Sequence, residues 1–208
     1  MAYLIPLMLL VLTAVGCAQP ARYIATEQDW EAAMAALDCP AREARQSDGF
    51  QSAAVAPAPL QPGEMRCIKV SAENPAAGSG VEIIQGRSYQ FAMTPLTVWY
   101  DRQVAADPIN GWGENLSLWL RFIRWISIKK ARSPGYDLMV LLGEVRGQPP
   151  VLFAFKDYVE QMDTKASKAS GTFIAPLSGK LTLFANDVKD YYENNSGYLV
   201  LKLQLANP

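Results

Sequence analysis

The sequence has 208 residues, and its 19 Lys and Arg against 20 Asp and Glu give a formal net charge of -1. This balance, with no basic stripe along the chain, argues against nucleic acid as a partner. The chain contains no histidine, which excludes Ser-His and Cys-His nucleophilic mechanisms and histidine-ligated zinc hydrolysis. The length fits one sizeable globular domain with an N-terminal extension.

The first residues resemble an export signal. Residues 4–15 form an apolar run followed by Gly16 and Cys17, and a run of about a dozen is too short to cross a bilayer, which needs about 20. The small residue before Cys17 resembles the lipobox of bacterial lipoproteins, in which that cysteine is acylated. We therefore expect a signal peptide at 1–16, lipidation of Cys17 and a membrane anchor in the bacterial cell envelope, the outer membrane being favoured over the inner. The alternative is an ordinary cleaved signal followed by a free cysteine.

Two further cysteines, Cys39 and Cys67, form an even pair once Cys17 is assigned to the lipid. Export places them in an oxidising compartment, so the sequence predicts a disulfide between them. Closing a loop of about 29 residues contributes roughly 3 to 4 kcal/mol when the geometry is unstrained.

A short helix is expected after the signal. Thr26 is a candidate N-cap followed by acidic residues, and Trp30, Met34 and Leu37 recur at helical spacing to form one apolar face. Pro40 lies just beyond the expected end of the helix.

The next segment, residues 41–64, is rich in Ala, Pro, Ser and Gln and is predicted to be a partly extended tether. The alternative is an irregular strand pinned by the disulfide. The expected organisation is therefore an N-terminal region at 17–64 and one main domain at 65–208.

From Cys67 onward the hydrophobic period changes to two, which is typical of half-buried strands. Strands are expected around Ile68–Ala72, Val81–Ile83, Tyr89–Met93, Leu138–Leu142 (ended by Gly143), Val151–Phe155, Gly171–Ala175, Lys180–Ala185 and Tyr198–Leu205. Short strands at turn-punctuated spacing predict an all-β fold, a β-sandwich of jelly-roll type.

The segment 115–130 is the exception, because it fits two patterns. Leu116, Trp119, Leu120, Ile123 and Ile126 make a helical stripe, but apolar residues also alternate here as they do in a strand. A helix in this segment is expected to bury its stripe and cap the sandwich core. The alternative is a helix that lies on a membrane surface.

The stretch from Asn186 to Gly197 concentrates oxygen ligands between two apolar segments and is a candidate calcium site. Calcium takes roughly 6 to 8 oxygens from carboxylates, carboxamides and carbonyls. Asp187 offers charge, Asn194 and Asn195 offer neutral oxygens, and the backbone carbonyl of Tyr191 is a further candidate. The alternative is that Asn-Asn-Ser-Gly is ordinary hairpin chemistry.

The same stretch resembles the PA-IL-like calcium-dependent galactophilic lectins of bacteria, which have a galactose-binding jelly-roll domain. In that family an Asn-Asp-Val run and a Tyr-x-Asn-Asn-Ser-Gly run hold calcium and, through it, two sugar hydroxyls. The resemblance covers about the last 130 residues, with only the loop being specific. It implies that calcium is bound by Asp187, the carbonyl of Tyr191, Asn194 and Asn195.

The resemblance also implies a second loop at the site, which we place at Trp99-Tyr100-Asp101. The expected ligand-binding set is Trp99, Tyr100, Asp101, Asp187, Val188, Asn194 and Asn195. Trp99 or Trp112 could stack on a sugar, although tryptophan is more often packed in the core.

One departure from the family matters for the ligand. Its members carry a His-Pro-x-Gln run that reaches the sugar, and this chain has no histidine. We therefore expect a non-catalytic, calcium-dependent, lectin-like lipoprotein whose partner is a glycan or other hydroxyl-rich ligand, without support for galactose.

Two alternatives to the lectin remain. The first is a structural or assembly lipoprotein of the envelope, in which the calcium site stabilises the fold or has degenerated. The second is an enzyme using Asp187, Asp190 and Glu193, which is disfavoured because acid-base work needs carboxylates that face each other across a substrate. The sequence leaves the oligomeric state open.

Overall fold

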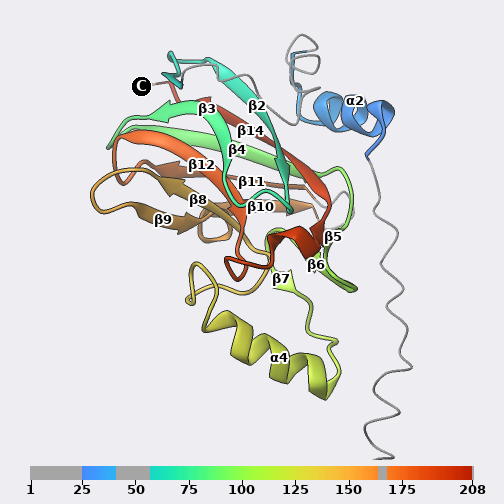
Figure 1. The fold of residues 1–208 in the computed structure, drawn as a ribbon. Coiled ribbons are helices and arrows are strands. Elements are labelled where there is room, and N and C mark those ends of the chain that lie inside the picture. Colours follow the sequence, from blue (N-terminus) through green and yellow to red (C-terminus); the bar gives the residue numbers. More distant parts are fainter. Residues whose placement is uncertain (1–24, 41–56, 164–167, 208) are drawn as a thin grey trace, which may run out of the picture.

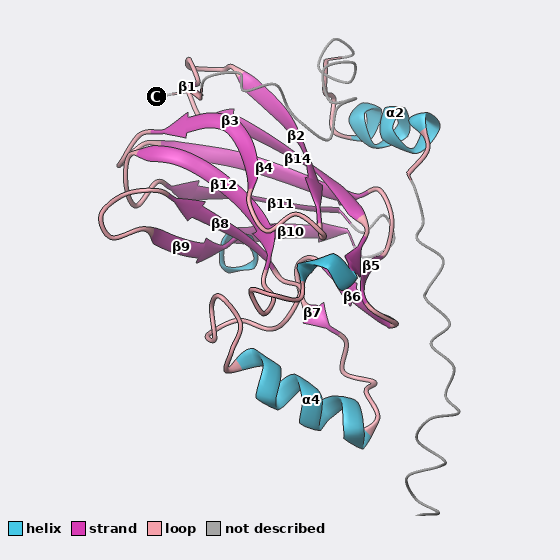
Figure 2. Cartoon of the chain, viewed as in Figure 1, coloured by secondary structure: helices cyan, strands magenta, loops and turns pink. Residues whose placement is uncertain are grey.

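The computed structural model describes residues 25–40, 57–163 and 168–207. The predicted signal peptide, Cys17 and residues 41–56 of the predicted tether lie outside the described residues. Two five-stranded sheets pack face to face around an apolar core (Figure 1), which confirms the predicted all-β sandwich. The described part also has two α-helices, which lie outside the sandwich (Figure 2).

The strands form three sheets. The first sheet contains, in spatial order, β1 (Ala58–Pro59), β3 (Ala77–Ile83), β12 (Gly179–Ala185), β8 (Leu141–Val145) and β9 (Val151–Ala154). The second contains β10 (Val159–Asp163), β11 (Lys168–Ile174), β4 (Ser88–Pro95), β14 (Tyr198–Leu205) and β2 (Met65–Ser71). A small third sheet contains β13 (Asn195–Ser196), β5 (Trp99–Asp101), β6 (Val104–Asp107) and β7 (Gly111–Trp112).

The strands form where the sequence alternates, because a period of two places one side chain in each pair toward the facing sheet. In β4, Tyr89, Phe91 and Met93 are all at most 3% exposed. The ring of Phe91 meets Phe155 edge-on at 5.1 Å between centroids, and Phe173 stacks on Tyr89 at 5.6 Å. Burying each such side chain contributes about 1.5 to 3 kcal/mol.

Strand β8 differs from its prediction. We expected a strand over Leu138–Leu142 that ended at Gly143, but β8 begins at Leu141 and continues through Gly143 to Val145. It begins late because Met139 has φ of +67°, which is incompatible with a strand. Gly143 continues the strand because it pairs with Leu183 of β12 and Phe153 of β9. A Cβ at this position would lie 2.5 Å from the ring of Phe153.

Part of the predicted tether belongs to the sandwich. Strand β1 pairs in parallel with Val81 and Glu82 of β3, and the next residue, Leu60, is 2% exposed in the core. The stretch 58–60 is therefore an edge of the first sheet, which agrees with the irregular strand that the sequence offered as the alternative.

Helix α2 (Glu27–Ala36) confirms the predicted N-terminal helix. Thr26 caps it, accepting the amide of Asp29 while the Asp29 carboxylate accepts the amide of Thr26. Trp30 and Met34 pack against Val200 on the outer face of β14. The disulfide between Cys39 and Cys67 is confirmed, with the two Cα atoms 6.2 Å apart, and it joins the end of α2 to β2.

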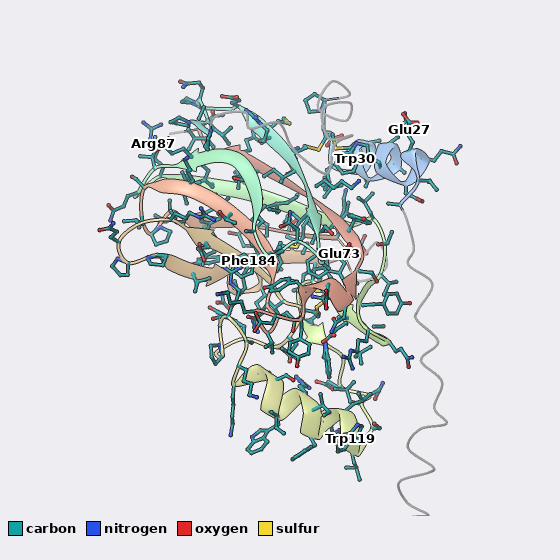
Figure 3. All side chains as sticks on the ribbon, in the orientation of Figure 1. Glu27, Trp30, Glu73, Arg87, Trp119 and Phe184 are labelled. Atoms are coloured by element: carbon teal, nitrogen blue, oxygen red, sulfur yellow. A yellow bond between two sulfur atoms is a disulfide. The ribbon has the colours of Figure 1, made fainter. Side chains whose placement is uncertain are left out.

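Helix α4 (Leu118–Ile128) resolves the ambiguous segment as a helix, capped by the hydroxyl of Ser117. Leu116, Leu120, Ile123 and Ile128 pack partly against the core. Trp119 does not join them, contrary to the expected stripe, since its side chain is 65% exposed and points away from the sandwich (Figure 3). Within the described residues, no helix combines the length and apolar character needed to cross a bilayer.

We predict that replacing both Cys39 and Cys67 with alanine lowers the free energy of unfolding by about 3 to 4 kcal/mol, because the unfolded chain regains the entropy of an open loop. Urea unfolding of the wild type and the double variant measures this. Wild-type protein reduced before unfolding should match the variant. A loss below about 1 kcal/mol would contradict an entropic role for the bond.

Candidate functional site

The candidate site begins where β12 ends, and Asn186 sets its position. The Asn186 side chain is fully buried. Its Nδ2 lies 3.0 Å from each of the carbonyl oxygens of Ser133, Tyr136 and Asp137, and its Oδ1 accepts the amide of Ser133 at 3.0 Å. These contacts hold the loop that follows α4 against the end of β12, so the next residue, Asp187, starts from a fixed backbone.

Asp187 is 2% exposed. Its Oδ1 accepts the amide of Val188 at 2.7 Å, and its Oδ2 accepts Nδ2 of Asn195 at 2.9 Å. Burial raises the pKa of the Asp187 carboxyl, and these two hydrogen bonds partly offset the rise. The carboxylate is thus buried in a position where it receives hydrogen bonds but has no cationic side chain bonded to it in the described structure.

Asn195 and Asn194 each have an unpaired buried oxygen. Nδ2 of Asn195 faces two acceptors, Asp187 and the carbonyl of Ala72 at 3.3 Å, so its Oδ1 must face the other way. The Oδ1 atoms of Asn194 and Asn195 are both buried without a hydrogen-bond partner. Leaving such an acceptor unsatisfied costs about 1 to 3 kcal/mol, which a cation would recover.

The Tyr191 carbonyl lies at the start of the 3-10 turn η3 (Tyr192–Asn194). It accepts the amide of Asn194 at 3.1 Å, which leaves one of its two lone pairs available. The Tyr191 side chain is 52% exposed, and Val188 is partly exposed. These two residues therefore lie on the solvent side of a cluster whose interior is Asp187 and Asn195.

The structure brings the second predicted loop to the same place. Strand β5 pairs with β13, with Asp101 opposite Asn195 and Tyr100 opposite Ser196, and the amide of Arg102 donates to the carbonyl of Asn194 at 3.1 Å. Asp101 belongs to the ligand-binding set that the sequence predicts. Its side-chain carboxylate is buried and lies close enough to Asp187 to feel its charge.

Burial is the main reason that the pKa of Asp101 rises from 3.8 to about 7, and the negative charge of Asp187 raises it further. The Arg102 guanidinium and the Trp112 indole lower it by smaller amounts. Two carboxylates that disfavour each other's ionisation in a buried cluster are a typical feature of a functional site.

The two tryptophans considered for sugar stacking are in the core. Trp99 is fully buried and Trp112 is 5% exposed, so neither side chain presents a face to a ligand. Trp99 contributes to the site only as part of the β5 backbone, and the core-packing alternative holds for both residues.

The three loop carboxylates lie in different surroundings. Asp190 and Glu193 are exposed to solvent, whereas Asp187 is buried.

The cluster is mixed in its ligand types. In the described ranges, no group of three or more His, Cys, Asp or Glu side chains is placed to hold a metal ion. The loops that meet here carry instead two carboxylates, two carboxamide oxygens and a carbonyl, which are kinds of oxygen that suit a hard cation. Two hollows, of about 270 and about 280 Å³, lie elsewhere, on the outer face of the second sheet.

Comparisons with known proteins found a structural match and no match in sequence. No protein-family model and no curated protein matches the sequence. One solved structure that is similar to this chain is described as "EclA N-terminal domain; PllA-like lectin". It is 19% identical, the match covers 67% of this chain and 95% of that one, and the TM-score is 0.40.

We predict that, in metal-free buffer, the free energy of unfolding falls as pH rises from about 4 to about 7. Over this range folded Asp101 keeps a proton that the unfolded chain has lost, since its pKa is raised from 3.8 to about 7. Asp101→Asn should flatten this part of the profile in urea titrations. Asp190→Asn, which removes an exposed carboxylate of the adjacent loop, is the control and should keep the wild-type slope. Equal slopes in all three proteins would contradict the raised pKa.

Proposed function

We propose that this protein is a non-catalytic, calcium-dependent, carbohydrate-binding lipoprotein of the bacterial envelope, anchored through Cys17. The observation that carries the proposal is the pair of buried, unpartnered oxygens of Asn194 and Asn195 in the loop that begins at the buried carboxylate of Asp187. A folded protein keeps unsatisfied buried acceptors where something else satisfies them.

The ligand set fits calcium. Asp187, Asn194, Asn195 and the Tyr191 carbonyl supply oxygens of the kinds that calcium accepts. Asp101 would add a second carboxylate, whose charge together with that of Asp187 would balance a doubly charged ion. When bound, calcium would supply open coordination positions to which neighbouring hydroxyl groups of a sugar can bind.

The accessible side of the cluster favours a small polar ligand. Tyr191 is exposed to solvent at its rim, and Val188 and Asn194 are partly exposed. The resemblance to the PA-IL-like galactophilic lectins supports the same use of the loop. Because the His-Pro-x-Gln run is missing, the protein should select a glycan other than galactose.

A structural role is the second candidate function, and one observation favours it. Nδ2 of Asn195 ties together Asp187 and the carbonyl of Ala72, which are distant in sequence. An ion held beside Asn195 would therefore stiffen the junction of these segments without any sugar.

We predict that calcium binds with a dissociation constant in the micromolar to millimolar range. At about 100 times that constant it should stabilise the fold by roughly 2.7 kcal/mol, seen as a higher melting temperature with calcium than with chelator. Asp187→Asn should abolish the shift, and Asp190→Asn should keep it. Magnesium should have little effect, because it demands a tighter octahedral shell. A full calcium shift in Asp187→Asn would remove the site assignment.

We predict weak, calcium-dependent binding to a glycan on a multivalent array. Affinity for one sugar should be low, because each missing side-chain hydrogen bond costs about 1 kcal/mol, and multivalent display should reveal it. Chelator and the Asn194→Ala plus Asn195→Ala variant should each abolish binding, while Asp190→Asn should retain it. Normal calcium loading with no glycan bound would favour the structural role.

A further inference from the structure

Helix α4 carries two apolar faces, and only one is used by the fold. Its inner face packs against the core through partly buried residues such as Leu120 and Ile123. Its outer face is exposed at four large apolar side chains: Leu118 (84%), Trp119 (65%), Phe122 (50%) and Trp125 (57%). They form one continuous surface, since the Phe122 ring lies 5.8 Å from that of Trp119 and 6.2 Å from that of Trp125.

Basic residues predominate around this face, and the exposed acidic residue Glu114 lies just before it. Residues 115–132 contain five basic residues and no acidic residue. Arg124 is paired with Asp137 through contacts of 2.8 and 2.5 Å, and Arg132 is paired with Glu144 at 2.8 Å. The other three cations are Arg121, Lys129 and Lys130, and none forms an ion pair with a carboxylate in the described structure.

We propose that the outer face of α4 binds an anionic phospholipid bilayer, with the helix lying in the plane of the interface. Tryptophan is enriched at the level of lipid headgroups. Lys129, whose Nζ lies 3.6 Å from the centre of the exposed Trp125 ring, is placed to meet lipid phosphates where that ring enters the interface. A large apolar surface rimmed by cations complements such a membrane on both counts.

Charge also favours a membrane over a second copy of the chain. Pairing two α4 faces would bring their unpaired cations together with no carboxylate on the helix to offset them. A phospholipid surface supplies the opposite charge to all three cations.

The placement of α4 would link this surface to the oxygen cluster, by which we mean the side chains of Asp101, Asp187, Asn194 and Asn195. Arg124 fixes the helix to Asp137, whose carbonyl contacts the Asn186 side chain. Just after the helix, Ala131 forms a β-bridge with Val188, and the amide of Arg132 donates to the carbonyl of Asp187 at 3.1 Å. A membrane-bound α4 would therefore hold the loop of Asp187 close to the lipid surface, which goes beyond the proposed calcium and glycan binding.

Tryptophan fluorescence of the full chain in vesicles tests the proposal. Protein is mixed with or reconstituted into phosphatidylcholine vesicles, prepared with and without phosphatidylglycerol. The lipid acyl chains of both kinds of vesicle carry bromine, which quenches tryptophan emission. Chelator is present throughout. The other three tryptophans, Trp30, Trp99 and Trp112, are at most 7% exposed. Quenching should therefore report Trp119 and Trp125.

We expect quenching and a blue shift that both increase with the phosphatidylglycerol content. Both effects should be lost in Trp119→Phe plus Trp125→Phe, because that variant lacks the two tryptophans that report binding. Leu118→Glu plus Phe122→Glu keeps both tryptophans and should also lose the quenching. Lys129→Glu plus Lys130→Glu should lose the dependence on phosphatidylglycerol. Ile174→Glu is the matched control, because Ile174 is 64% exposed on β11 and should leave quenching unchanged.

Two results would overturn the proposal. One is emission that bromine does not quench in either kind of vesicle. The other is a blue shift that appears without vesicles, grows with protein concentration and accompanies a dimer in sedimentation, which would assign the face to a second copy. Because chelator is present, failure here is separate from failure of the calcium site.

Discussion

The buried side chain of Asn186 is the contact on which the arrangement of the site depends. Its carboxamide group joins the end of β12 to residues 133–137. Its backbone amide donates to the carbonyl of Val140, and its carbonyl accepts the amide of Met139. One residue therefore fixes the exit of a core strand, the loop that leaves α4 and the entry to β8. A hydrophobic residue of similar size would fill the space but leave the loop carbonyls without donors.

The oxygen cluster departs from what is best for stability alone. Asp101 and Asp187 share a buried environment, and the carboxamide oxygens of Asn194 and Asn195 have no donor. The rest of the sandwich compensates through dense packing, with Trp99 fully buried beneath the same loops. Such local cost within an otherwise consistent fold is expected where a site serves a purpose other than folding.

Much of the fold could be predicted from the sequence, because long strands and a capped helix have local signals. The short strands β5, β6, β7 and β13 were not predicted, since two to four residues carry too little periodicity and their pairing is decided by tertiary contacts. The same limit explains the outer face of α4: Trp119 fits a helical stripe, but periodicity alone does not tell which side of an apolar helix meets the core. The loop residues 187–195 were identified by type, whereas the approach of the Asp101 side chain depends on the β5–β13 register.

The disulfide has a consequence for how the domain would be released from a membrane. Cys39 and Cys67 enclose the Ala-rich stretch of residues 41–56 in a covalent ring. A protease that cuts once inside the ring leaves the two fragments joined, so α2 and everything before it stay attached to the sandwich. For a chain anchored through Cys17, shedding by such a cut would require reduction as well as cleavage.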